Sequence, residues 1–137
     1  MLPRFVSYIS NGIYDIGCTG QTVCVYDKHG AELAKFKDLI YAYYSAISPH
    51  GDMFVVKSTD GRIAVYSLKT LSLIKKFRYS KVNYAQDDGF CFSADGKYFI
   101  NIERQGGSCT RLYQFMTLLT FQEYPNFYLV ISECLKI

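Results

Sequence analysis

Short apolar runs separated by turn-forming residues follow one another along most of the chain. In the run Arg62-Ile63-Ala64-Val65-Tyr66-Ser67, Ile63 and Val65 would face the same side of a strand, because strand side chains alternate between two faces. The Asp60-Gly61 pair before this run supplies the positive φ angles of a tight hairpin. The run LSLIKKF at 71–77 also fits helical spacing, but its shortness favours a strand. The pattern therefore predicts an all-β fold.

The strand pattern repeats three times along the sequence. Tyr26, Tyr66 and Tyr113 each end the third apolar run of a copy, and they lie 40 and 47 residues apart. A repeat of about 40–45 residues is the length of one four-stranded propeller blade. We expect a single domain over 1–137, with three repeat units at about 4–37, 43–78 and 89–122. A tail strand at 126–132 would then begin a fourth, truncated unit.

Motifs in these units resemble those of the WD-repeat β-propeller family. Ser48-Pro49-His50-Gly51 and Ser93-Ala94-Asp95-Gly96 match the motif before the second strand of a blade, and Asp60-Gly61 matches the following turn. Tyr66 and Tyr113 stand where the family has the Trp of its Trp-Asp pair. The resemblance implies a partial β-propeller of about three four-stranded antiparallel blades. The chain has no Trp and no Gly-His dipeptide, so the family's internal hydrogen-bond network is not implied, and a β-sandwich or another meander is the alternative.

Three blades are too few to close a ring, and an open stack exposes the outward faces of its first and last blades. Such faces are expected to be apolar and to need a cover. We therefore expect a homo-oligomer, with a dimer favoured, in which blades of two copies complete a common ring. The alternative is that the chain is a piece of a longer propeller.

Fifteen basic and twelve acidic residues give the chain a small net charge of +3, so any electrostatic function must be local. This balance does not mark the whole chain as a nucleic-acid-binding protein. The segment 61–86, however, has six basic residues and no acidic one, interleaved with aromatic residues. That composition suits an anionic partner. The favoured interpretation is that Lys75 and Lys76 lie on an edge strand, where lysines discourage edge-to-edge aggregation.

The sequence shows no residue pattern typical of a catalytic or metal site. His29 and His50 fall in predicted turns without a second ligand or a nucleophile at recognisable spacing. The Asp87-Asp88 pair has no further oxygen ligands beside it for calcium. The five cysteines are irregularly spaced and indicate reduced thiols in a cytoplasmic protein. We expect no catalytic residue, no cofactor and no metal. The apolar stretch 127–131 is far shorter than the ~20 residues needed to span a bilayer, so we expect no membrane partner.

These observations favour a non-catalytic protein-interaction scaffold that self-associates and binds an unidentified protein partner. Tyrosine suits such a surface because it offers contact area and a hydroxyl at low entropic cost. The loops that join one unit to the next are the expected contact regions. The candidate contact residues are Tyr41, Tyr43, Tyr44, Lys75, Lys76, Arg78, Tyr79, Lys81 and Tyr84. The alternative function is binding of nucleic acid or another anionic partner through the basic segment 62–81.

Overall fold

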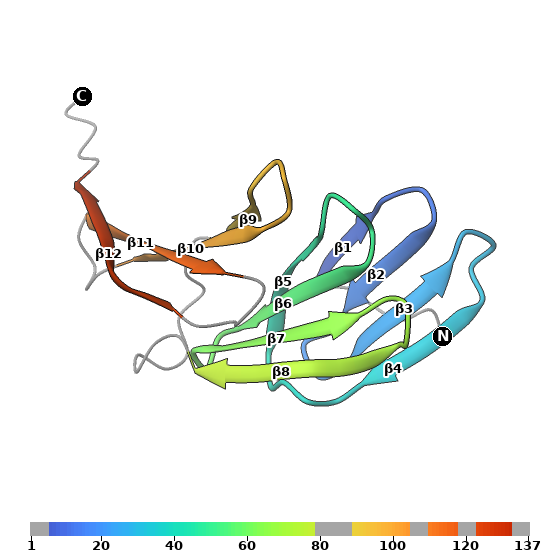
Figure 1. Cartoon of the computed structure of the whole chain (residues 1–137). Coiled ribbons are helices and arrows are strands. Elements are labelled where there is room, and N and C mark those ends of the chain that lie inside the picture. The colour runs from blue at the N-terminus through green and yellow to red at the C-terminus, as the bar shows by residue number, and fades with distance from the viewer. Residues whose placement is uncertain (1–5, 79–88, 105–109, 118–122, 133–137) are drawn as a thin grey trace, which may run out of the picture. The chain divides into compact units, whose positions relative to one another are not determined.

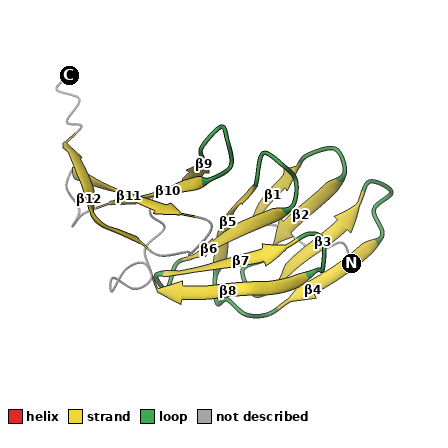
Figure 2. Cartoon of the chain, in the orientation of Figure 1, coloured by secondary structure: helices red, strands yellow, loops and turns green. Residues whose placement is uncertain are grey.

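The structure is a computed structural model that describes residues 6–78, 89–104, 110–117 and 123–132, with side chains described as far as residue 102. In this part of the chain every regular element is a β-strand, so the predicted all-β class is confirmed (Figures 1 and 2). The strands form three four-stranded antiparallel sheets. The contacts divide the chain into two compact units, Met1–Gln86 and Asp87–Ile137, and each is described by itself below.

The first unit contains two sheets, each with its strands in sequence order. The strands of the first sheet are β1 (Ser7–Ser10), β2 (Tyr14–Cys18), β3 (Val23–Asp27) and β4 (Glu32–Phe36). Those of the second sheet are β5 (Ala42–Ile47), β6 (Met53–Ser58), β7 (Arg62–Ser67) and β8 (Ser72–Arg78). Gly61 has a φ of 82° in the turn between β6 and β7, as the Asp60-Gly61 hairpin predicted. The segment 71–77, whose spacing also fits a helix, lies almost entirely in strand β8, at the edge of the second sheet.

The core of the first unit lies where its two sheets pack together, with β1 beside β5. Ile16 and Val25 of the first sheet and Phe54 of the second have no exposed surface. The Tyr66 ring lies between two phenylalanines, with its centroid 4.3 Å from that of Phe36 and 4.8 Å from that of Phe54. Full burial of an apolar side chain of this size contributes roughly 1.5–3 kcal/mol. Of the repeated tyrosines, Tyr66 is therefore a core residue, whereas Tyr26 is only partly buried.

Both faces of the second sheet carry fully buried residues. Phe54 and Tyr66 belong to one face, and Val55, Ile63 and Val65 alternate with them on the other. The apolar runs of the two central strands, β6 and β7, are nearly continuous, which is typical of strands buried on both faces.

The second unit contains the third sheet, with strands β9 (Phe90–Phe92), β10 (Tyr98–Arg104), β11 (Thr110–Thr117) and β12 (Glu123–Ser132). Phe99 is fully buried, and its ring packs edge-on against Phe90 at 6.2 Å between centroids. Strand β12 pairs with β11, for example Tyr113 with Leu129, so it is the fourth strand of this sheet.

The tail at 126–132 was expected to begin a fourth, truncated unit; instead it belongs to β12, the fourth strand of the third sheet. Its apolar run pairs with the free edge of β11 from Thr110 to Gln114, and this pairing satisfies backbone groups that would otherwise stay open. Residues 118–122, the expected last strand of the third repeat, lie outside the described residues.

Candidate partner-binding site

The structure places the described candidate residues in two groups. Tyr41 directly precedes β5, whereas Tyr43 and Tyr44 lie within β5 and not in the preceding loop, where they were expected. Lys75, Lys76 and Arg78 all lie in β8. The remaining candidates, Tyr79, Lys81 and Tyr84, lie outside the described residues.

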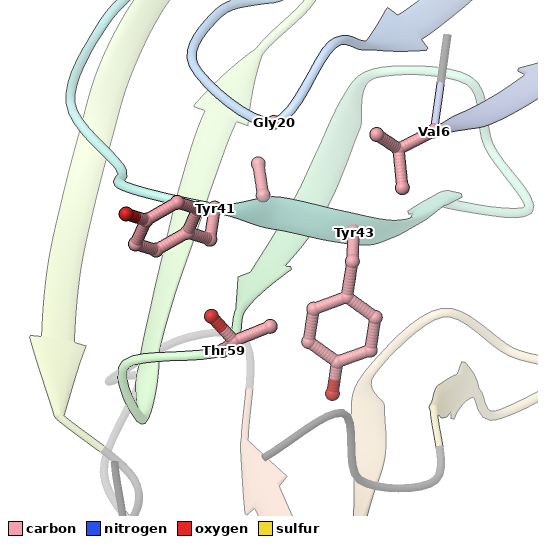
Figure 3. Close-up of a pocket in the computed structure, with 6 residues that line it drawn as sticks. Val6, Gly20, Tyr41, Tyr43 and Thr59 are labelled. Atoms are coloured by element: carbon pink, nitrogen blue, oxygen red, sulfur yellow. The ribbon is translucent and has the colours of Figure 1, made fainter. Parts of the chain in front are cut away.

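Two of the three tyrosines line a small pocket in the first unit (Figure 3). The pocket has a volume of about 160 Å³ and is lined by Val6, Gly20, Tyr41, Ala42, Tyr43 and Thr59. These residues come from the start of β1, the β2–β3 turn, the start of β5 and the β6–β7 turn. Figure 3 shows the Tyr41 and Tyr43 rings with the Thr59 side chain between them in this view. Tyr44 is not among the lining residues.

Tyr41 is held in an unusual backbone conformation at the wall of this pocket. Its φ of 58° lies in the left-handed region, which costs a residue with a Cβ roughly 1–2 kcal/mol. Its N–H donates to the carbonyl of Gly20 at 2.6 Å, and its carbonyl accepts from the N–H of Thr59 at 3.2 Å. The Tyr41 side chain is 53% exposed, so burial of the ring does not explain the conformation. Strain of this kind is concentrated at functional sites.

The turn that contributes Thr59 to the pocket is bordered by two arginines. Arg78 Nη1 donates to the carbonyl of Asp60 at 2.9 Å, and Arg62 Nη1 lies 3.6 Å from Asp60 Oδ2. The hydroxyl of Ser58 donates to the other carboxylate oxygen of Asp60.

The two lysines of β8 do not join this group. Lys76 Nζ donates to the carbonyl of Asp38 at 3.3 Å, in the loop between β4 and β5. Lys75 is the next residue along the strand and so belongs to the opposite face. Both lie on the edge strand of the second sheet, the position that the favoured interpretation of the basic segment expected.

Two tyrosines of the first unit have raised pKa values. Burial, followed by the nearby carboxylate of Asp38, raises the pKa of Tyr66 far above its usual value. Burial, with smaller contributions from Cys24 and Glu32, raises the pKa of Tyr26 to about 12. A tyrosine phenol is protonated at neutral pH even without such a shift, and Tyr66 uses its proton to donate to Asp38. Among the described residues, no three His, Cys, Asp or Glu side chains gather as a metal site requires.

Several buried polar residues gave no sign in the sequence. Lys57, which follows the apolar residues of β6, and Asn101, in β10, have no exposed surface. The hydroxyls of Ser7 and Ser45 are buried without an ordinary hydrogen-bond partner and lie near the thiol of Cys18, which is only a weak one. Burial raises the pKa of the Cys18 thiol, and the two hydroxyls partly offset that rise. Strand periodicity alone cannot distinguish these positions from apolar ones.

Comparison with known proteins defines the fold without defining a family. No family model and no curated protein matches the chain. One similar solved structure is Kuenenia stuttgartiensis hydrazine synthase, with a TM-score of 0.73 and 21% sequence identity. The similarity covers 90% of this chain and 35% of the chain of that structure. In all, 577 chains of solved structures match, so the fold is common and by itself does not select a function. No helix in the described part of the chain has the length and hydropathy needed to cross a membrane.

Proposed function

We propose that this chain is a non-catalytic protein-interaction module, built as a partial propeller of the WD-repeat type. Three four-stranded meanders of similar length support the propeller interpretation. So does the packing of β1 beside β5, since propeller blades pack face to face.

The observation that carries the interaction proposal is the exposed, strained Tyr41 at the wall of the pocket. Its backbone is fixed by Gly20 on one side and Thr59 on the other, while its ring is open to solvent. A rigid scaffold that presents an aromatic ring beside a small pocket is suited to binding another protein, because little side-chain freedom is lost on contact. The lining residues supply hydroxyls and apolar surface, and none of them is an acid, a base or a thiol nucleophile.

We also propose that the chain self-associates, with a dimer favoured. The open face of the first sheet is less apolar than was expected for an uncovered blade. The face of the first sheet opposite its core residues carries Tyr8, Asp15, Tyr26 and Lys35. Light scattering after size exclusion, over a range of concentrations, tests this part. A dimer mass supports it, and a monomer at all concentrations contradicts it.

The second candidate function is binding of nucleic acid or another anionic partner through the segment 62–81. The pair Arg62 and Arg78 at the Asp60 turn favours it. Such binding would weaken steeply as salt rises, because neutralised phosphates release counterions. Binding that is insensitive to ionic strength would exclude this candidate.

The interaction proposal is tested by affinity capture from extracts of the source cells with matched variants. Tyr41→Gly removes the exposed ring and suits the left-handed backbone, so the fold is retained. Ile13→Ala removes another exposed apolar side chain, 63% accessible, from the β1–β2 turn and serves as the control. We expect a partner that the original chain and the control retain and that Tyr41→Gly loses. A set of captured proteins that is identical for all three chains contradicts the proposal.

A further inference from the structure

We propose that β-bulges at Leu33 and Ile74 block strand addition at the edges of the two sheets of the first unit, so that copies of this chain do not associate edge to edge. The edges in question are those of β4 and β8, the last strands of the first and second sheets. Neither strand contributes to the pocket beside Tyr41, so the inference goes beyond the proposed function and does not depend on it.

In the first sheet, the pairing of β3 with β4 shifts at Leu33. The neighbours of Leu33 on either side pair with Val25 and Tyr26, which are consecutive residues of β3. Leu33 is therefore an extra residue in β4, with no opposite number in this ladder. Two residues of one strand against one of its partner is the arrangement that defines a β-bulge.

An ion pair within β4 provides independent evidence for this bulge. Lys35 Nζ lies 3.7 Å from Glu32 Oε1, although the two residues are three apart in the chain. In a regular strand, residues three apart face opposite sides of the sheet. The extra residue at Leu33 places both charged side chains on the same face and allows the contact.

The second sheet repeats the bulge at the equivalent position. The neighbours of Ile74 on either side pair with Val65 and Tyr66, which are consecutive in β7, so Ile74 is the extra residue of β8. Both extra residues are aliphatic and exposed, Leu33 by 40% and Ile74 by 45%. In each sheet the bulge lies opposite the Val-Tyr pair of the third strand, so it is a feature of the repeat rather than an irregularity of one sheet.

A bulge is effective at such an edge because strand addition needs evenly spaced backbone groups. A regular edge strand presents a row of N–H and C=O groups that can pair with a strand of another chain, and exposed apolar side chains add to the attraction. A bulge disrupts that spacing and increases the local twist. Strand β8 also carries Lys75 and Lys76, whereas β4 has one lysine, Lys35, which is paired with Glu32. The bulge is therefore the main barrier on β4 and one of two barriers on β8.

Deletion of Leu33 or of Ile74 in the full chain tests the proposal, because each deletion removes a bulge and leaves every other pair of the ladder in register. Circular dichroism checks the strand content, and light scattering after size exclusion measures the mass over a range of concentrations. We expect the mass of each deletion variant to rise with concentration to at least about twice that of the original chain, and further for Leu33. The matched controls Leu33→Ala and Ile74→Ala keep the extra residue and should have the mass of the original chain.

A second substitution distinguishes edge pairing from association elsewhere on the chain. Leu73→Lys, added to the deletion of Ile74, places a further charge on the same edge and should restore the original mass. Association that persists in this variant would overturn the proposal, as would an unchanged mass in both deletion variants or association of the alanine controls. Loss of strand content in both deletion variants would also overturn it, because the bulges would then be needed within their own sheets.

Discussion

The hydroxyl of Tyr66 donates a hydrogen bond to Oδ2 of Asp38 at 3.1 Å, across 28 residues of sequence. The bond joins the third strand of the second sheet to the loop that leaves the first sheet, so it ties together the two sheets of the first unit. The ring of Tyr66 meanwhile packs in the core between Phe36 and Phe54. One side chain thus supplies both apolar contact and a specific link between sheets.

Removal of this hydroxyl should weaken the first unit. Tyr66→Phe keeps the ring and its packing but loses the hydrogen bond, which is worth about 1.5–3 kcal/mol because the acceptor is a carboxylate. Tyr66→Ala also loses the ring and leaves a cavity, at a cost of about 3–5 kcal/mol. Urea unfolding followed by circular dichroism measures both. If Tyr66→Phe were as unstable as Tyr66→Ala, the hydrogen bond rather than the packing would dominate, contrary to this account.

Substitution by alanine should change the unfolding free energy differently at two buried serines. Ser45 and Ser48 are both 5% exposed, but the Ser48 hydroxyl donates to Asp52 Oδ1 at 2.8 Å and accepts from the N–H of Met53 at 3.2 Å. Ser45 has only the weak thiol of Cys18 nearby. We expect Ser48→Ala to lose about 1 kcal/mol of unfolding free energy and Ser45→Ala to lose nothing or gain up to about 1 kcal/mol. Equal losses in thermal or urea unfolding would show that the Ser45 hydroxyl has a real partner.

The left-handed backbone at residue 41 predicts an unusual order of stabilities. Tyr41→Gly relieves the steric cost of a Cβ at a φ of 58°, whereas Tyr41→Val adds a β-branched side chain there. The ring is half exposed, so its loss costs little burial. We expect the glycine variant to be about 1–2 kcal/mol more stable than the valine variant. Equal urea midpoints for the two variants would mean that residue 41 is not left-handed in solution.

Acid should destabilise the β3–β4 turn through Asp27. The Asp27 carboxylate accepts hydrogen bonds from the N–H groups of Ala31 at 3.0 Å and His29 at 2.8 Å, and these lower its pKa. Because the folded pKa is below the unfolded value of about 3.9, this contribution is present above that pH and is lost as the pH falls through the folded pKa. Asp27→Asn should therefore flatten the decline of urea midpoints between about pH 4 and pH 2. An unchanged decline would assign the acid sensitivity to other carboxylates, such as Asp95, whose pKa is lowered in the same way by Ser93 and Lys97.

The strands were predictable from the sequence because alternation and turn residues act locally. Asp60-Gly61 marked the β6–β7 hairpin, and the repeated tyrosines marked the third strand of each sheet. The partner of the last strand was not predictable in this way. Both the segment 118–121 and the tail satisfy a strand pattern, and the choice depends on pairing with β11, which is a tertiary interaction.

The candidate site was predictable only in part. Tyrosines and basic residues were evident by composition, but the left-handed Tyr41 depends on hydrogen bonds to Gly20 and Thr59, which lie far from it in sequence. The position of Arg78 near the Asp60 turn could have been predicted, because an antiparallel β7–β8 pair returns the end of β8 to that turn. The burial of Lys57 could not be predicted, because a lysine near the end of an apolar strand is ordinarily expected to be exposed.

Hydrogen–deuterium exchange of the chain, with and without its captured partner, tests whether the partner binds at the Tyr41 pocket. The account predicts slower exchange at the start of β5, around residues 40–43, and in the turn at 58–62. The turns at 27–31 and 48–52, which contribute nothing to this pocket, serve as internal references. Slower exchange confined to those turns, with no change at Tyr41 and Thr59, would contradict the account.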